Sequence, residues 1–285
     1  MELVIGALLL AAAGFVIGMF SGLLGVGGGT MVVPVLRLGF GLEAVCATAT
    51  SLFTIIFTSI GGTITHLRKK TCLPKLSLCL GLGGAVTSSL GALLGSLSPS
   101  WAVMLAAALI IFYSGFSMLR KALKLPAAPR KQAQGAAAAA GQAAGKPPLQ
   151  ATAMPPAGFE FNWKKGLGGL GIGMLAGLAS GYVGVGGGFL MVPMMVGLLG
   201  VPMCLASGTS LLAIMILAIP GVITQFCLGN VDVVAGIFVA LGSIPGAMVG
   251  ARFVTRIPER QLRFIFAGFL GVAAVLLLLN EAGLF

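Results

Sequence analysis

Charged residues are scarce in this sequence. They make up 8% of its 285 residues, against roughly 25% in an ordinary soluble domain, while 58% of the residues are hydrophobic and the mean hydropathy is +1.09. So few charges could not cover the surface of a soluble protein of this size. The composition therefore excludes a water-soluble enzyme, a disordered chain and a coiled coil, and it predicts an all-α polytopic protein embedded in a lipid bilayer.

Acidic residues and metal-binding residues are scarcer still. The 6 acidic residues lie outside the middle of the apolar stretches, and the only histidine is His66. A proton-driven carrier usually needs a titratable group within the membrane, but His66 stands beside Arg68 and is interpreted as an interfacial residue. The 5 cysteines form no CxxC pair, and one histidine cannot complete a Cys/His zinc set. We therefore expect no metal ion and no cofactor.

The 17 basic residues gather at the ends of apolar stretches, at 68–75, 120–165 and 252–263, with only Arg37 apart. Such clusters are typical of the cytoplasmic loops of membrane proteins. No aromatic residues alternate with them to stack bases, so we expect no nucleic-acid partner. The apolar N-terminus contains Glu2 and has no basic region before it, so it is interpreted as the first membrane segment rather than a signal peptide.

Apolar stretches fall into two groups separated by a segment of different composition. The stretches lie at 3–20, 30–41, 44–65, 76–97 and 101–119, and again at 167–179, 189–200, 203–226, 232–251 and 262–279. Between them, residues 121–165 are rich in alanine, glycine, glutamine, proline and basic residues, which is typical of a flexible linker. We therefore divide the chain into a first transmembrane unit at 1–120, the linker at 121–165 and a second unit at 166–285.

The two units are copies of one another. Residues 21–34 read SGLLGVGGGTMVVP and residues 180–193 read SGYVGVGGGFLMVP, and the same offset of 159 pairs Pro99 with Pro258 without a gap. Repeats within a membrane protein commonly indicate a transporter whose site lies where the repeats meet. The sequence predicts two homologous repeats with 8–10 membrane segments, including helices broken at the glycine runs.

Basic residues also bear on the orientation of the second repeat. The connection at 67–75 is basic whereas its counterpart at 226–231 is not, and the reverse holds for 98–100 and 252–263. This exchange of charge favours inverted repeats, each with an odd number of crossings. The competing topology has four crossings per repeat and places the arginines of 252–263 outside.

The glycine runs Gly25–Gly29 and Gly184–Gly188 are the central chemical feature. Glycines at this density break a helix and expose backbone N–H groups, which a membrane tolerates only around a cavity or within protein. A new apolar segment follows each run, so its helix N-terminus would attract an anion. The alternative is close packing of helices through small residues. A nucleotide-binding loop is excluded because no Lys-Ser/Thr pair and no strand accompany the glycines.

Hydroxyl residues recur at equivalent positions after each glycine run. They bind either the carbonyl one turn earlier or a neighbouring helix, or they donate to the anion. The candidate substrate-binding residues are Gly25, Gly27, Gly28, Gly29, Thr30, Thr50, Ser51, Gly184, Gly186, Gly187, Gly188, Thr209 and Ser210.

The duplicated G-x-G-G-G-x-x-x-x-P block, followed by an alanine, threonine and serine run ending in Thr-Ser, resembles the TauE/SafE family of sulfite exporters, also called TSUP anion transporters. The resemblance covers about 21–120 and 166–280, and the linker departs from it. It implies a multi-pass protein of the bacterial inner membrane that moves sulfite, organosulfonates or related anions. It also implies a role for the two glycine runs, Pro34 and Pro193, and both Thr-Ser pairs.

We therefore expect a secondary transporter that exports sulfite or an organosulfonate such as sulfoacetate, driven by the inside-negative potential. The alternatives are a channel or uptake carrier for another small anion, and a non-transporting membrane scaffold. An intramembrane protease using Ser207 and His66 is disfavoured, because Ser207 aligns with Thr48 of the first repeat and the duplication already explains it. We therefore expect that the protein is not an enzyme.

Overall fold

The computed structural model describes residues 2–124 and 163–281, and helix is the regular structure that they form. The first repeat contains α1 (Glu2–Leu24), α2 (Gly29–Phe40), α3 (Ala44–Arg68), α4 (Pro74–Leu97) and α5 (Ser100–Lys124). The second contains α7 (Trp163–Val183), α8 (Gly188–Leu198), α9 (Met203–Cys227), α10 (Val233–Phe253), a short 3₁₀ turn η1 (Val254–Arg256) and α11 (Glu259–Glu281). Most of the linker expected at 121–165 lies outside the described residues. Its described ends, 121–124 and 163–165, are helical and belong to α5 and α7, because alanine, leucine and lysine favour helix.

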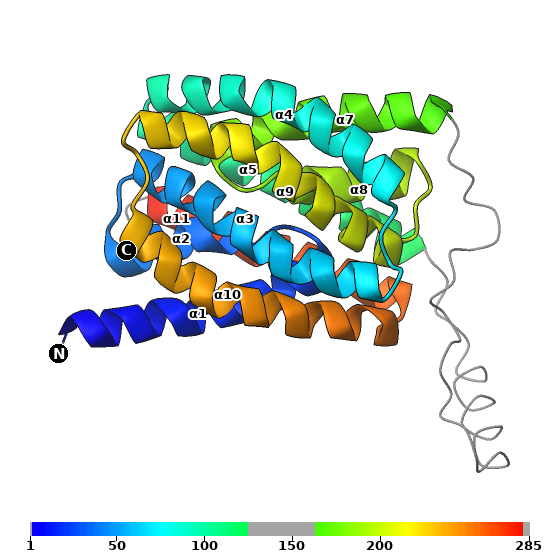
Figure 1. Cartoon of the computed structure of the whole chain (residues 1–285), viewed down its shortest axis with the longest axis horizontal. Helices are drawn as coiled ribbons and strands as arrows, with labels where there is room; N and C mark the ends of the chain where they lie inside the picture. Colours follow the sequence, from blue (N-terminus) through cyan, green and yellow to red (C-terminus); the bar gives the residue numbers. More distant parts are fainter. Residues whose placement is uncertain (1, 125–162, 282–285) are drawn as a thin grey trace, which may run out of the picture.

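Eight of these helices are long and apolar enough to cross a membrane. The two shorter apolar helices are α2 and α8, which follow the glycine runs. The 12 residues of α2 cover only about 18 Å, whereas the hydrocarbon core of a bilayer is about 30 Å thick. Each of the eight long helices is therefore long enough to cross a bilayer by itself, whereas α2 and α8 are not, and these two lie within the bundle that the long helices form (Figure 1).

Glycines govern the packing of α1 against α10. Residues four apart on α1 lie against residues four apart on α10, in the pairs Gly14 with Val239, Gly18 with Ser243 and Gly22 with Ala247. A Cβ atom at any of these glycines would overlap the carbonyl oxygen of its partner. The residue numbers rise together along both helices, so α1 and α10 are parallel and in backbone contact, as small residues permit in membrane helices.

The same packing joins α7 to α4. Here the pairs are Gly173 with Leu80, Gly177 with Gly84 and Gly181 with Ser88, again rising together. The offset of 159 carries Gly14, Gly18 and Gly22 onto Gly173, Gly177 and Gly181, so both contacts come from one repeated pattern. Each contact joins a helix of one repeat to a helix of the other.

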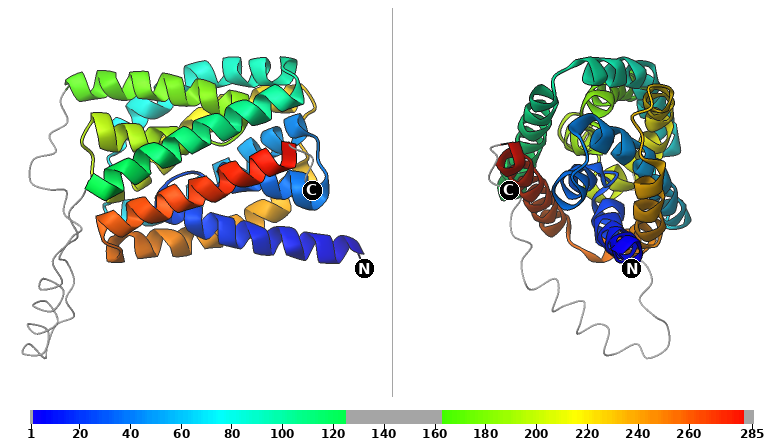
Figure 2. Two further views of the ribbon diagram at one scale, coloured as in Figure 1. Left: turned by 180° about the vertical axis from the view of Figure 1, so that it is seen from behind. Right: turned by 90° about the vertical axis from the view of Figure 1, so that its left-hand side faces the viewer.

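Two further contacts fix the direction of the remaining helices. Thr58 of α3 and Ser243 of α10 share a hydrogen bond of 2.6 Å, and the contacts between these helices rise in parallel. Gly81 and Gly84 of α4 likewise face Ile216 and Leu217 of α9. Together with the short connections, these contacts make α1, α3, α5 and α10 run one way and α4, α7, α9 and α11 the other (Figures 1 and 2).

Basic residues lie at one end of the bundle. Among the described residues, every lysine and arginine except Arg37 is at the end where α3, α5 and α10 finish and α4, α7 and α11 begin. There the Lys69 Nζ donates to the Arg252 carbonyl at 2.5 Å and to the Thr255 hydroxyl at 3.2 Å. Burial of its side chain and the charge of Arg256 lower the pKa of Lys69.

Candidate functional site

Each glycine run forms the loop between a long helix and a short one. Gly25, Gly27 and Gly28 have φ of 76°, 88° and 88°, and their counterparts Gly184, Gly186 and Gly187 have 75°, 90° and 68°. Residues with a Cβ rarely adopt these angles. Gly28 and Gly187 are the N-caps of α2 and α8, and neither helix receives a side-chain cap.

The two glycine loops meet in the interior of the bundle. A Cβ on Gly29 would lie 2.7 Å from the Val185 carbonyl oxygen, and one on Gly188 would lie 2.8 Å from that of Val26. Gly27 and Gly186 both face Ile55, near the midpoint of α3, and Gly27 also faces Ile214, near the midpoint of α9. Loops from different repeats therefore pack backbone to backbone at mid-height of the bundle.

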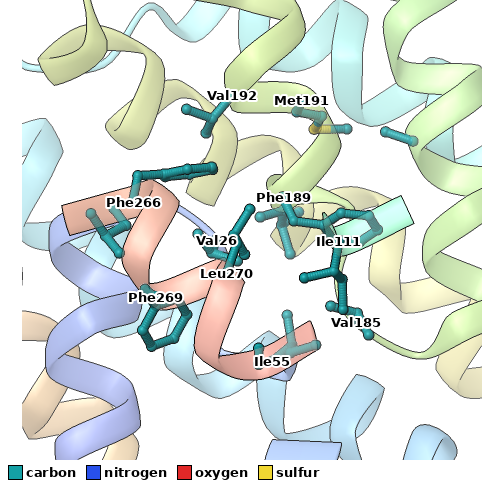
Figure 3. Close-up of a cluster of buried hydrophobic side chains, with 14 of the residues drawn as sticks. Val26, Ile55, Ile111, Val185, Phe189, Met191, Val192, Phe266, Phe269 and Leu270 are labelled. Atoms are coloured by element: carbon teal, nitrogen blue, oxygen red, sulfur yellow. The ribbon is translucent and has the colours of Figure 1, made fainter. Parts of the chain in front are cut away.

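Apolar side chains surround this meeting point. Val26 and Val185 of the two loops are fully buried. Figure 3 shows them among Ile55, Phe189 and Phe266, which come from α3, α8 and α11. The loops are thus enclosed by hydrocarbon except for their own backbone atoms and nearby hydroxyl groups.

Several backbone N–H groups in the loops are unused. In the part of the chain that the structure describes, those of Gly27 and Gly28, and those of Gly186 and Gly187, form no hydrogen bond with another backbone group. They precede the N-termini of α2 and α8, where the helix dipole is positive. Each loop therefore presents donors suited to an anion, with no fixed positive charge among its glycines.

A buried serine lies beside the N-cap of each short helix. The Ser21 Oγ lies 3.6 Å from the position of a Cβ on Gly28, and the Ser180 Cβ lies 3.4 Å from that on Gly187. Both serines are 0% exposed, and their hydroxyls have no hydrogen-bond partner among the described residues. They were not among the sequence candidates. The signal that could have identified them is their place as the first residue of the duplicated block.

Two of the residues predicted from the sequence also have buried hydroxyls without a hydrogen-bond partner. The hydroxyls of Thr30, in the first turn of α2, and of Ser51, one turn before Ile55 on α3, are buried and have no partner among the described residues. Ser51 thus lies on the same face of α3 as the side chain that contacts the glycine loops.

The hydroxyls of the other candidate residues form hydrogen bonds with backbone groups. The Thr50 hydroxyl accepts the Asp232 N–H at 2.9 Å, and the Thr209 hydroxyl accepts the Leu73 N–H at 3.1 Å. These bonds are equivalent in the two repeats, and each joins the start of one helix to a helix of the other repeat. Ser210 donates to the Gly25 carbonyl at 2.7 Å. Thr50, Thr209 and Ser210 therefore stabilise the packing of the helices around the glycine loops.

Close packing also explains part of the glycine runs. A Cβ on Gly25 or Gly184 would lie within 2.6 Å of backbone atoms of Ser207 or Thr48. The nearest neighbour of a Cβ on Gly28 would be 3.4 Å away, which is an ordinary contact. The packing alternative thus applies to the first and last glycines of each run, whereas Gly28 is required for its backbone angle.

His66 is a structural residue in this geometry. Its ring is fully buried, with Nδ1 2.8 Å from the Thr71 hydroxyl and Nε2 2.9 Å from the Gly22 carbonyl. The ring is buried because the last turn of α3 packs against α1, and its expected place at the membrane interface stays a prediction. Its repeat counterpart Gln225 makes the equivalent bond to Asn230 at 2.8 Å.

Known proteins that resemble this chain are membrane transporters. The family model described as "Sulfite exporter TauE/SafE" matches residues 10–277. The Bacillus subtilis (strain 168) "Probable membrane transporter protein YdhB" is 29% identical over 265 residues, covering 93% of this chain and 97% of its own. "Probable membrane transporter protein YunE" of the same organism is 26% identical, covering 89% of each chain. A "Probable membrane transporter protein" of Xylella fastidiosa (strain Temecula1 / ATCC 700964) is 26% identical, covering 86% and 84%. No solved structure matches the chain.

Proposed function

The chain belongs to the TauE/SafE family of multi-pass bacterial membrane transporters and is not an enzyme, and on this premise we propose that it exports a small anion, namely sulfite or an organosulfonate such as sulfoacetate. The observation that carries the proposal is the pair of glycine loops that meet inside the bundle. Their free N–H groups and the unpartnered hydroxyls of Ser21 and Ser180 supply several donors beside the two loops. An oxyanion with several acceptor oxygens suits such a set.

The placement of acidic residues supports an anionic substrate. In the described ranges, Asp and Glu lie at or beside helix ends, as Glu43 and Asp232 do before α3 and α10. A carboxylate near the glycine loops would repel an anion and would need a partner in this apolar setting. The interior instead offers neutral donors, which can bind an anion without holding it as tightly as a buried arginine would.

A line of unpartnered hydroxyls supports a route toward the basic end. Ser51, Ser59 and Thr63 lie on α3 at spacings that place them along one side of the helix, and all three are buried without partners among the described residues. The repeat counterparts of Ser59 and Thr63 are the apolar residues Ala218 and Val222, whereas that of Ser51 is Ser210. We propose that the anion moves along this side of α3 between the basic end and the glycine loops.

We further propose that the repeats are inverted. The opposite directions of α1 and α7, of α3 and α9, of α4 and α10, and of α5 and α11 support this topology. It brings both basic clusters to one end of the bundle, which the positive-inside rule assigns to the cytoplasm. The inside-negative potential then drives an anion outward with about 2.3 kcal/mol per charge per 100 mV.

Flux measurements in proteoliposomes test the proposed substrate and driving force. Purified protein is reconstituted with sulfite, sulfoacetate, sulfate or thiosulfate inside the vesicles, and efflux is followed with and without a potassium diffusion potential. We expect efflux of sulfite or sulfoacetate that rises with inside-negative potential and is absent from protein-free vesicles. Potential-independent flux, flux of an unrelated anion alone, or no flux from folded protein would contradict the proposal.

A further inference from the structure

A pocket of about 480 Å³ lies between α5, α7 and α8, apart from the glycine loops. Ser114, which is 1% exposed, lines it, and its hydroxyl has no partner among the described residues. A second pocket of about 350 Å³ shares Tyr113, Ser117 and Lys121 with the first and continues to Arg120 and Lys124. The two form one groove along α5, which we call the α5 groove. Figure 2 shows α8 beside α5 in the view from behind.

The α5 groove is basic at one end and apolar at the other. Lys121 lies three residues before the end of α5, about 5 Å along the helix axis, and thus near the basic end of the bundle. Leu175 and Leu190 line the groove further toward mid-height, halfway along α7 and at the start of α8. The groove therefore has the polarity of a lipid, with charge at the level of the headgroups and hydrocarbon at the level of the acyl chains.

Lys121 is held in place at the polar end. Its Nζ donates to the Pro193 carbonyl of α8 at 2.7 Å. An ammonium group has three N–H donors, so this bond leaves two for a ligand. The Arg120 guanidinium lies 4.2 Å from the centre of the Phe116 ring, which orients a second positive charge beside the groove.

The hydroxyl and basic groups that line the groove are absent from the equivalent positions of the other repeat. The offset of 159 pairs Tyr113 with Val272, Ser117 with Leu276 and Lys121 with Asn280. The proposed substrate site, by contrast, is built on glycine loops and on Ser21 and Ser180, which are present in both repeats. The α5 groove is therefore a feature of one end of the bundle, and hence of one leaflet, rather than of the duplicated transport machinery.

We propose that the α5 groove binds an anionic phospholipid from the leaflet at the basic end, with the phosphate at Lys121, Arg120 and Lys124 and an acyl chain against Leu175 and Leu190. Basic pockets between membrane helices on the cytoplasmic side suit anionic headgroups. The bound lipid contacts Met194 and Gly197 of α8, the helix that begins at the second glycine loop. Lipid binding therefore stabilises the position of α8 against α5.

Native mass spectrometry of the purified protein tests this site. The protein is supplied with phosphatidylglycerol or with phosphatidylcholine of the same acyl chains, and soluble glycerol phosphate is added as a headgroup competitor. The test variant is Arg120→Gln/Lys121→Gln/Lys124→Gln. The control is Arg68→Gln/Lys70→Gln/Lys75→Gln, which removes three charges from the same end but outside the groove.

We expect the wild-type protein and the control to retain phosphatidylglycerol in preference to phosphatidylcholine, and glycerol phosphate to leave this preference unchanged. The test variant should bind phosphatidylglycerol more weakly by on the order of a hundredfold, since each basic residue near an anionic lipid contributes about 1 kcal/mol. Equal retention of the two lipids by the wild-type protein would overturn the proposal. So would full displacement by glycerol phosphate, undiminished binding by the folded test variant, or burial of the groove in a dimer.

Discussion

Buried hydroxyl groups in this protein are of two kinds. Those of Thr50, Thr209 and Ser210 bind backbone atoms of the opposite repeat, and a fold would need them whether or not it transported anything. Those of Ser21 and Ser180 bind nothing among the described residues. A buried hydroxyl without a partner costs about 1–3 kcal/mol, so its presence at equivalent places in both repeats calls for a ligand.

Replacing these serines should therefore separate transport from stability. Ser21→Ala and Ser180→Ala should leave the thermal unfolding temperature in detergent unchanged or slightly raised. Loss of a hydrogen bond to a charged ligand costs about 1.5–3 kcal/mol, so efflux in proteoliposomes should fall roughly 10- to 100-fold. Ser210→Ala serves as the contrast, because it leaves the Gly25 carbonyl without its bond and should lower the unfolding temperature. Normal efflux by both Ser21→Ala and Ser180→Ala would refute the assignment.

The sequence identified the glycine runs and the Thr-Ser pairs, but it could not distinguish free hydroxyls from occupied ones. The partners of Thr50 and Thr209 are the N–H groups of Asp232 and Leu73, more than 130 residues away in each case. No spacing within one repeat encodes that contact. Ser21 escaped notice for the opposite reason, since a serine at a helix end is unremarkable until its neighbours are known.

At the scale of helices, glycine spacing sets the closest contacts between helices of the two repeats. The contact of α7 with α4 depends on Gly173, Gly177 and Gly181, which remove the side chains that would separate the two backbones. Gly171, on the same helix, has no atom within 4 Å of the place of a Cβ. One helix thus contains glycines with opposite roles.

Alanine substitution should reveal this difference. Gly177→Ala places a Cβ against the Gly84 carbonyl and should destabilise the protein by about 1–3 kcal/mol, as overpacking does in other cores. Gly171→Ala should be neutral or stabilising by up to about 1 kcal/mol, because the unfolded chain has less conformational freedom with alanine than with glycine. Thermal unfolding of both variants in the same detergent measures the difference, and equal unfolding temperatures would contradict the packing described for α4 and α7.

Helix boundaries were largely predictable, whereas helix partners were not. The apolar stretch expected at 30–41 corresponds to α2, and that at 203–226 corresponds to α9. Periodicity reports which face of a helix is apolar, but most faces here are apolar, so it could not indicate that α1 packs on α10. The four-residue spacing from Gly14 to Gly22 marks the contact face without naming the partner.

At the scale of the whole molecule, the proposed inverted repeats predict which end of the bundle faces the cytoplasm. If the repeats are inverted, the end containing Arg68 and Arg256 faces the cytoplasm and the end containing Cys227 faces outward. Cys227 is exposed and free, so it is a natural reporter once the other cysteines are replaced. A membrane-impermeant maleimide added to intact cells should label Cys227, whereas Arg68→Cys and Arg256→Cys, each in a background without native cysteines, should be labelled only after permeabilisation.

The competing topology gives a different pattern. Four crossings per repeat would place positions 68 and 256 on opposite sides of the membrane, so that one of the two would be labelled in intact cells. A cytoplasmic protein with an exposed cysteine, which should stay unlabelled in intact cells, serves as the control for cell integrity. Labelling of position 256 in intact cells would refute inverted repeats.

The pairing of α1 with α10 also has a consequence for biosynthesis. Gly14, Gly18 and Gly22 are among the first residues made, but the residues that cover them, from Val239 to Ala247, emerge more than 200 residues later. At about 5–20 residues per second, the ribosome needs roughly 10–45 s to bridge that interval. During this time the glycine face of α1 lacks the helix that covers it, so a nascent chain stalled after the first repeat is an incomplete bundle that quality-control proteases can recognise.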